Sequence, residues 1–251
     1  MDQHIDRDMR CVLDPSRPIT PQLHHFLRDR IIRNVLKPGD RLSEAEIARS
    51  CEVSRQPVRE AFIKLSEQGL LSIRPQRGTI VTTIAFSTVL DARFVREAIE
   101  ADIVRLLARR PADAALIARL RAQIERQRAV AGTAPRDFIQ LDEQFHRTLA
   151  EAAGKSGAWT LMEGLKSQMD RVRFLALGRF PVDKLIAQHE AIVEGIVKGD
   201  VSAADAATRA HLREILNDLP TIMADNPGFF DGAWADTDTD TDNETTGGDP
   251  I

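Results

Sequence analysis

The 251-residue chain has few cysteines and no long apolar run, and both absences narrow the class of protein it can be. Its two cysteines, Cys11 and Cys51, are too few for a disulfide framework, which favours free thiols in a reducing cytoplasm. No stretch approaches the roughly 18 apolar residues that a membrane span needs. The charged N-terminus also lacks the apolar core of a secretory signal peptide. The sequence therefore predicts a cytoplasmic protein without a membrane segment.

An overall positive charge is also missing, because the formal net charge is −4. The charges are unevenly distributed, however: residues 1–85 carry +3, residues 86–230 are neutral and residues 231–251 carry −7. Positive charge is what attracts the phosphates of nucleic acids. The total thus hides a basic N-terminal third, and it does not exclude DNA binding.

The basic third contains a stretch, residues 41–81, that predicts two short helices followed by a hairpin. Ser43 and Glu46 form a capping box, which predicts the start of the first helix. After a tight turn, Ser54 is expected to cap the second helix. The two β-prone runs in residues 70–81 then form a two-stranded wing. This order of elements is typical of a winged helix-turn-helix.

The second of these helices carries polar side chains away from its apolar face, namely Arg55, Gln56 and Arg59. Arginine recognises guanine edges and phosphates, and glutamine can recognise adenine, so this helix suits the major groove. Arg77 and Gly78 at the tip of the wing are expected to reach the minor groove. The alternative is a small helical domain with a solvated charged face.

The segments RLSEAEIA, VSRQPVREAF and GLL, with the later Arg-Gly pair, resemble the winged helix-turn-helix of the GntR family of bacterial transcription regulators. The resemblance covers roughly residues 18–83. Carried over residue by residue, the DNA contacts of the family fall on Ser54, Arg55, Arg59 and Gly78. Asn34 stands where the family usually has glycine, and asparagine is the next best residue for a left-handed helix end. Ala45 replaces an arginine contact of some members, so their operator preference does not carry over.

From residue 86 onward the sequence lacks strand-like alternation and predicts six helices instead. They are expected near residues 87–109, 112–131, 136–153, 157–178, 182–199 and 202–218. Short connections between such helices imply an antiparallel bundle. The expected fold is therefore mostly α, with an N-terminal winged helix-turn-helix followed by an all-α antiparallel six-helix bundle. The predicted divisions are a flexible leader over 1–17, the DNA-binding domain over 18–84, the bundle over 86–220 and an acidic disordered tail over 228–251.

Three histidines follow residue 86, and each lies on a predicted helix: His146, His189 and His211. Asp142 precedes His146 by four residues, so the two side chains share one helix face. Burying three imidazoles and a carboxylate would cost free energy unless they shared a partner. A divalent metal is that partner, and three nitrogens with one oxygen suit zinc first, with nickel or manganese also possible. Taken singly, each residue would be an ordinary core histidine.

The segments LDEQFHRTLAEAAG and QHEAIVEGIVKGD, with the later AHL, resemble the FCD ligand-binding domain of the FadR-type GntR subfamily over roughly residues 88–218. The resemblance fills all four metal positions of that domain and implies that Arg96 lines an effector pocket. Arg96 could instead serve only as an intrahelical partner of Glu100. Arg171 and Arg173 are further candidates for holding an anion.

These features together predict a metabolite-responsive transcription regulator, expected to act as a repressor, and not an enzyme. A homodimer would bind a pseudo-palindromic operator in double-stranded DNA, and the bundle would bind a divalent metal and a small carboxylate effector. Two alternatives remain open. One is a metal-dependent enzyme on a helical bundle, and the other is a sensor domain with a purely structural metal and no effector.

Overall fold

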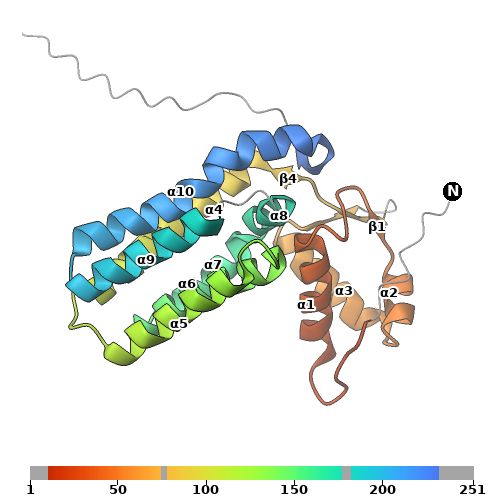
Figure 1. The fold of residues 1–251 in the computed structure, drawn as a ribbon. Helices are drawn as coiled ribbons and strands as arrows, with labels where there is room; N and C mark the ends of the chain where they lie inside the picture. Colours follow the sequence, from red (N-terminus) through yellow and green to blue (C-terminus); the bar gives the residue numbers. More distant parts are fainter. Residues whose placement is uncertain (1–10, 75–77, 177–181, 232–251) are drawn as a thin grey trace, which may run out of the picture.

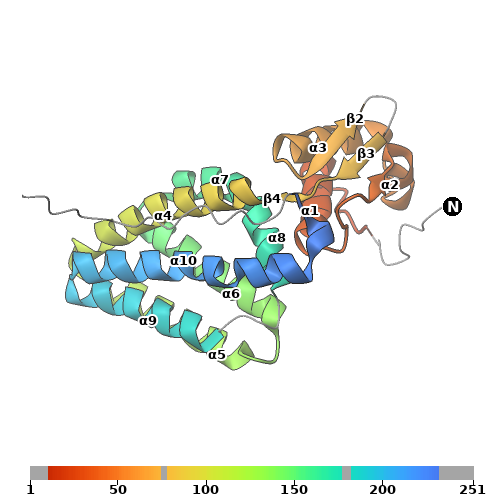
Figure 2. The ribbon, with the colours of Figure 1, turned by 90° about the horizontal axis from the view of Figure 1, so that it is seen from above.

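The computed structural model describes residues 11–74, 78–176 and 182–231, and within them the chain is mostly α-helical, as predicted. Figures 1 and 2 show two parts, a small head formed by the N-terminal third and an elongated helical bundle formed by the rest of the described residues. No helix in the described part of the chain combines the length and the apolar character that crossing a bilayer requires.

The head is a winged helix-turn-helix with a sheet of three antiparallel strands in the order β1-β3-β2. Ser43 accepts a hydrogen bond from the backbone N–H of Glu46, as the predicted capping box requires. Ser54 occupies the N-cap position of the next helix, but its side chain makes no capping hydrogen bond, which corrects that part of the prediction. The elements are α1 Ile19–Ile32, β1 Arg41–Leu42, α2 Glu44–Ser50, α3 Arg55–Glu67, β2 Leu71–Arg74 and β3 Gly78–Val81.

The helical bundle packs most of its helices around an apolar core that contains Leu120, Phe145 and Ile192. In Figure 1 the long helices α5, α6, α9 and α10 run roughly alongside one another. At one point α9 and α10 approach so closely that a Cβ on Gly195 would lie 2.8 Å from Ala204. The helices are α4 Phe86–Ala108, α5 Ala114–Val130, α6 Pro135–Ala152, α7 Ser156–Leu165, α8 Ser167–Leu175, α9 Val182–Lys198 and α10 Val201–Asp225.

The predicted fourth helix, residues 157–178, is two helices, so the described bundle has seven rather than six. The break falls at Lys166, which ends α7 and precedes α8. Its Nζ atom lies 2.7 Å from Glu143 and 3.0 Å from Asp170, so the turn is held by contacts with α6 and α8. Lys166 itself is neither glycine nor proline, and the local signal for the break is limited to Gly164 two residues earlier, a residue that a continuous helix also tolerates.

The last helix is longer than predicted, because α10 continues through Pro220 to Asp225. Proline removes one backbone hydrogen bond from a helix. Here Leu219 and Ile222 stay buried in a second small core with α8, which favours continuing the helix. Beyond it, a 3₁₀ turn (Pro227–Phe229) leads to strand β5 (Phe230–Asp231), which pairs in parallel with β4 (Ile84–Ala85). The predicted tail therefore begins inside the fold, and its remainder lies outside the described residues.

The two cysteines differ from the prediction, because a disulfide joins Cys11 to Cys51 at the end of α2. Residues 11–17 also lie against the head: the side chain of Gln22 donates hydrogen bonds to the carbonyls of Asp14 and Arg17. This part of the predicted flexible leader is thus fixed by tertiary contacts that the sequence pattern does not reveal. Residues 1–10 lie outside the described residues.

Helix α8 connects the helical bundle to the head. Gln168 donates to the carbonyl of Gly69 at the end of α3 (2.9 Å), and Arg171 donates to the carbonyl of Thr82 after the wing (2.9 Å). Asn34 has the predicted left-handed backbone, with φ of 55°, and its side chain donates to the carbonyl of Arg171 (3.0 Å). Figure 2 shows α8 between the bundle and the head.

Candidate metal centre and DNA-reading face

Four side chains from three helices meet inside the helical bundle, and they are the four that the sequence singled out. Asp142 and His146 come from α6, His189 from α9 and His211 from α10. All four are buried, and His189 is fully so. We call them the histidine cluster.

The distances within the histidine cluster fit a single small cation. His211 Nε2 lies 3.0 Å from His146 Nε2 and 3.2 Å from His189 Nε2. Asp142 Oδ1 lies 3.5–3.9 Å from the three Nε2 atoms. Ligands about 2.0–2.1 Å from a tetrahedral zinc ion are about 3.3–3.4 Å from one another. These five distances lie near that value, and the four residues offer ligand atoms that all lie within 4.8 Å of one another.

The outer nitrogen of each imidazole faces an oxygen, which determines where its proton sits. His146 Nδ1 lies 2.7 Å from a Glu100 oxygen, His189 Nδ1 2.8 Å from Gln127 Oε1, and His211 Nδ1 3.1 Å from Gln188 Oε1.

The amide orientations are consistent with the network, because Gln127 Nε2 donates to the carbonyl of Leu141 and Gln188 Nε2 donates to Glu214. Each imidazole is thus held with its proton on Nδ1 and its Nε2 lone pair inward. Three lone pairs and a carboxylate that face one another repel unless a cation lies between them.

The electrostatics keep these ligands in the forms that bind metals. Burial lowers the pKa of His189 to about 3 and that of His211 well below its ordinary value, so both are neutral near pH 7. Burial opposes ionisation of Asp142, but the positive charge of Arg173 outweighs it and holds the pKa of Asp142 well below the usual range. Neutral imidazoles with an ionised carboxylate are the species that bind divalent metals.

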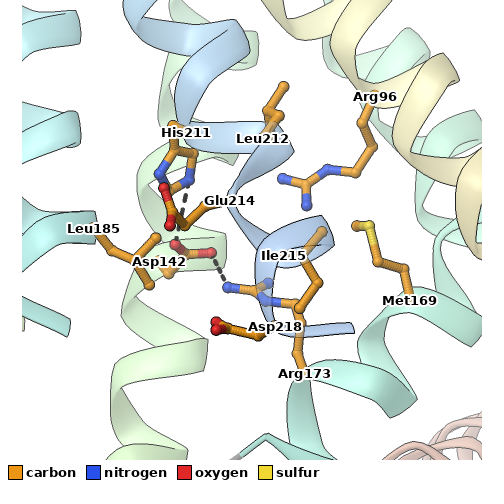
Figure 3. Close-up of a pocket in the computed structure, with 10 residues that line it drawn as sticks. All are labelled: Arg96, Asp142, Met169, Arg173, Leu185, His211, Leu212, Glu214, Ile215 and Asp218. Carbon is orange, nitrogen blue, oxygen red and sulfur yellow. Dashed lines mark hydrogen bonds and ion pairs between the residues drawn. The ribbon is translucent and has the colours of Figure 1, made fainter. Parts of the chain in front are cut away.

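A small cavity with two buried guanidinium groups adjoins the histidine cluster (Figure 3). Arg173 forms an ion pair with Asp142, and Arg96 Nε donates to Glu100 (2.6 Å). Nη2 of Arg96 and Nη1 of Arg173 are buried without a hydrogen-bond partner. The cavity encloses about 30 Å³ and is lined by Arg96, Asp142, Met169, Arg173, Leu185, His211, Leu212, Glu214, Ile215 and Asp218.

The structure separates the three arginines proposed from the sequence. Arg96 and Arg173 line the cavity, and Arg96 is also the intrahelical partner of Glu100. A role of Arg96 in binding an effector stays a prediction. Arg171 does not reach the cavity: it is fully buried at the contact with the head, and burial lowers its pKa to about 10. Two residues apart on one helix, Arg171 and Arg173 point about 200° away from each other, so periodicity separates them but does not tell which one faces the cavity. The break before α8 decides that.

The sequence interpretation missed Gln127, Gln188 and Asp218. Gln127 is fully buried on α5, a helix that supplies none of the four ligand atoms. The one signal for it in the sequence was a glutamine on the inward side of a predicted helix. Glu214 and Asp218 lie three and seven residues after His211 on α10. That spacing places them on the helix face of His211 and could have been read from the sequence.

The proposed DNA-reading residues lie on the outside of the head. The side chains of Arg55 and Arg59 are 69% and 66% exposed, and both approach Glu44 of α2, at 3.5 and 3.7 Å. Gln56 is also exposed and donates to Glu60 one turn further along α3. No capping bond engages the hydroxyl of Ser54.

The wing is only partly described. Gly78 begins β3 with φ of 86°, a left-handed conformation that favours glycine, and open space surrounds the position of a Cβ. Arg77 lies outside the described residues. The structure thus brings the α3 candidates together on one exposed face and leaves the arginine of the wing tip as a prediction.

Comparison with known proteins agrees with both halves of this description. Residues 20–81 match the bacterial regulatory proteins of the gntR family, and residues 91–214 match the FCD domain. The chain is 37% identical over 220 residues to the HTH-type transcriptional repressor RspR of Escherichia coli K12, covering 87% of this chain and 96% of that protein. It is also 37% identical over 207 residues to an HTH-type transcriptional regulator in an unstable DNA locus of Streptomyces ambofaciens, covering 81% and 86%.

Solved structures show the same fold. E. coli McbR/YncC superposes with a TM-score of 0.68 at 18% identity, covering 83% of this chain and 99% of that one. The sequence matches and the winged head agree on the class of protein. The chain belongs to the GntR family of bacterial regulatory proteins, with an FCD domain, and is a DNA-binding transcriptional regulator rather than an enzyme.

Proposed function

We propose that this regulator is a repressor whose sensor bundle binds a divalent metal and a small carboxylate effector. The observation that carries the proposal is the convergence of three imidazole Nε2 atoms and Asp142 Oδ1 on one point. The lone pairs face inward because Glu100, Gln127 and Gln188 hold the outer nitrogens. Zinc fits this donor set first, and nickel or manganese also suit it.

A carboxylate is the effector chemistry that the adjoining cavity favours. Arg96 and Arg173 each have a buried N–H group without a partner there, and a carboxylate accepts such hydrogen bonds with matching geometry. When bound, the metal would supply a Lewis-acidic position for a carboxylate oxygen. The arginines would then orient the acid and neutralise its charge.

Helix α8 offers a direct route from the cavity to the DNA-reading head. Met169 and Arg173 line the cavity, whereas Gln168 and Arg171 on the same helix bond to the head. An effector that displaces Arg173 from Asp142 would therefore move a helix whose other face holds α3 and the wing. Coupling between two such sites is typically about 1–3 kcal/mol, which would change operator affinity about 5–150-fold.

Operator binding is proposed to need two copies of the chain, because helix-turn-helix proteins bind paired half-sites. Helices α4 and α7 contact each other, and both carry exposed apolar side chains that are suited to this contact. Phe94 and Leu161 are 66% and 76% exposed, and Leu165 is exposed one turn after Leu161. Exposed apolar patches of this kind commonly mark protein contacts. A second copy covering this face would bury all three side chains.

The test is thermal denaturation of the full chain with a panel of small carboxylates, each with and without a metal chelator. Stabilisation by an acid that disappears on chelation, together with release of a bound operator by the same acid, is the expected result. Stabilisation by zinc alone, with no response to any acid, would instead favour a purely structural metal. An unchanged denaturation midpoint with zinc, nickel and manganese would refute the metal site.

A further inference from the structure

The disulfide of the head occurs in a class of protein that rarely contains one. The chain has two cysteines, and a bond joins them: Cys11 lies before α1, and Cys51 is the C-cap of α2. A transcriptional regulator works where the DNA is, and cellular reductants keep most thiols reduced there. Disulfides that form in such a compartment are usually transient and serve catalysis or redox sensing. The pair is therefore a candidate for a bond that opens and closes.

The bond holds a segment whose other attachments to the head are weak. Within residues 11–17, Cys11 and Leu13 are partly buried against the core of the head, and the other five residues are exposed. The side chain of Gln22 exchanges hydrogen bonds with the backbone of Asp14 and Arg17, but water can reach all of them. Hydrogen bonds that water can replace contribute little net free energy. Reduction would therefore loosen residues 11–17 while the apolar core of the head stays packed.

The other end of the bond lies at the turn that positions the DNA-reading helix. Cys51 follows α2 directly, and Ser54 and Arg55 come three and four residues later, at the start of α3. Cys51 is only 7% exposed and packs in the core of the head. The bond closes a covalent loop over residues 11–51, which contains α1, β1 and α2. Such a loop removes conformational freedom from less ordered states and so favours one arrangement of the turn.

We propose that Cys11 and Cys51 form a redox-active site whose oxidation by a peroxide strengthens operator binding. The oxidised head holds the turn before α3 in the arrangement that presents Arg55 and Arg59 to solvent, so less freedom is lost when DNA binds. Loosening by reduction restores that freedom and lowers the affinity. The inference goes beyond the proposed function, because neither the metal nor the effector takes part in it.

The reaction balances with the two thiols and one peroxide. Cys11 is the more accessible of the two, and its thiolate attacks a peroxide oxygen, which gives a sulfenic acid and releases the first water. Burial of Cys51 in the core disfavours a thiolate, so Cys51 is the resolving residue. Its sulfur attacks the sulfenic sulfur, the S–S bond forms, and the displaced hydroxide takes the thiol proton and leaves as the second water. The thiols lose two electrons, which reduce the peroxide to water.

Thiol counting tests whether the site is redox-active. The reduced full chain is treated with hydrogen peroxide, and free thiols are labelled with a maleimide of polyethylene glycol and separated on a gel. We expect both thiols to disappear in a single chain and to return with dithiothreitol. Cys51→Ser should stop at the sulfenic acid of Cys11, which dimedone traps, whereas Cys11→Ser should give no such adduct. Thiols that persist in peroxide, or a bond that joins two chains instead, would overturn the inference.

Fluorescence anisotropy then measures the effect on DNA, with a labelled duplex that the chain selects from a random-sequence pool. At fixed salt, the oxidised wild type should bind at least about fivefold more tightly than the reduced form, the lower end of typical coupling between two sites. Coupling is reciprocal, so the same duplex should make the bond harder to reduce by the same factor in glutathione redox buffers.

The variant Cys11→Ser is the main control, because it removes the bond at a partly exposed position and leaves the core around Cys51 intact. It should bind the duplex as the reduced wild type does, with and without peroxide. Equal or weaker binding by the oxidised wild type, or a peroxide effect that persists in Cys11→Ser, would overturn the inference. Neither result would affect the proposed function, whose own test measures zinc and acids at the histidine cluster.

Discussion

The two functional regions of this regulator are built in opposite ways. Arg55 and Arg59 on the head are solvated side chains from one short helix, and their surroundings are nearly complete within residues 44–59. The histidine cluster is buried, and it combines α6, α9 and α10 with outer partners from α4 and α5. One region is thus local and exposed, whereas the other exists only after the bundle has folded.

This difference determines what each region contributes to stability. Exposed arginines keep their hydration, so removing one changes binding while the fold is nearly unaffected. Buried imidazoles with inward lone pairs repel one another and weaken the bundle until a cation binds. Variants of the two regions should therefore separate cleanly, with metal affinity and stability changing together in one and DNA affinity changing alone in the other.

The largest expected effect is on metal binding by His189→Ala. His189 is fully buried and supplies one of four ligand atoms, so its removal should weaken zinc binding more than about 100-fold, beyond the usual loss for an outer partner. Zinc-dependent thermal stabilisation should disappear with it. Competition with a chromogenic chelator measures the affinity, and His25→Ala, an exposed histidine of the head, should behave as the wild type. Stoichiometric zinc in the variant would remove His189 from the site.

Arg59→Ala should produce the converse result. Loss of an arginine contact costs about 1–3 kcal/mol per half-site, so a dimer on two half-sites should bind its operator at least about 30-fold more weakly. The denaturation midpoint and the affinity for zinc should stay unchanged. Fluorescence anisotropy with labelled operator at fixed salt provides the measurement, and Arg109→Ala on the bundle is the matched control. If the Arg59 variant bound the operator as tightly as the wild type does, Arg59 would not be a DNA contact of α3.

The local region was also the more predictable one. The capping box of Ser43, the left-handed backbone at Asn34 and the exposed arginines of α3 follow from spacing over a few residues, and the structure agrees with each. The four residues of the histidine cluster were predictable as well, because each lies at a helical position beside an apolar stripe. Periodicity identifies the inward face of a helix without needing the partner helix.

Features that depend on tertiary contacts escaped prediction. The break at Lys166 is stabilised by Glu143 from another helix, and without it Arg171 could not be assigned to the head and Arg173 to the cavity. Continuation of α10 through Pro220 depends on burial against α8, and the disulfide depends on the return of residue 11 to α2. In each case the deciding interaction joins residues far apart in the chain.

A smaller effect is expected from Gln127→Leu, which tests the outer partners of the cluster. Gln127 Oε1 faces His189 Nδ1, and leucine would leave the imidazole without that acceptor. Losing such a partner typically weakens metal binding 10–100-fold. Gln123→Leu is the control: Gln123 is also buried on α5, but it donates to Thr148 and not to the cluster. Both variants should lose stability, and only Gln127→Leu should lose zinc affinity. If the two variants bound zinc equally tightly, the contact between Gln127 and His189 Nδ1 would not support zinc binding.

The smallest expected effect concerns a buried carboxylate, Glu97, whose hydrogen bonds all come from the protein itself. Glu97 on α4 accepts hydrogen bonds from Arg213 (2.9 Å), Arg209 (3.0 Å) and Arg93 (2.8 Å). The hydrogen bonds from Arg213, followed by those from Arg209 and Arg93, outweigh the effect of burial and lower the pKa of Glu97 from 4.5 to about 2. Arg209 and Arg213 are partly exposed, so the contribution to stability is about 1–2 kcal/mol rather than the full value of the shift.

Because the pKa of Glu97 is lower in the folded state, its contribution is present above the unfolded value of 4.5 and is lost as the pH falls toward about 2. The stability difference between wild type and Glu97→Gln should therefore be constant near neutral pH and shrink in increasingly acidic solution. Urea unfolding from about pH 7 to about pH 3, with and without chelator, measures it. The difference at neutral pH should be the same with and without chelator, because protein donors occupy Glu97. A difference that depended on zinc would place Glu97 in the same network as the histidine cluster, and the contrast between satisfied and metal-dependent buried charge would fail.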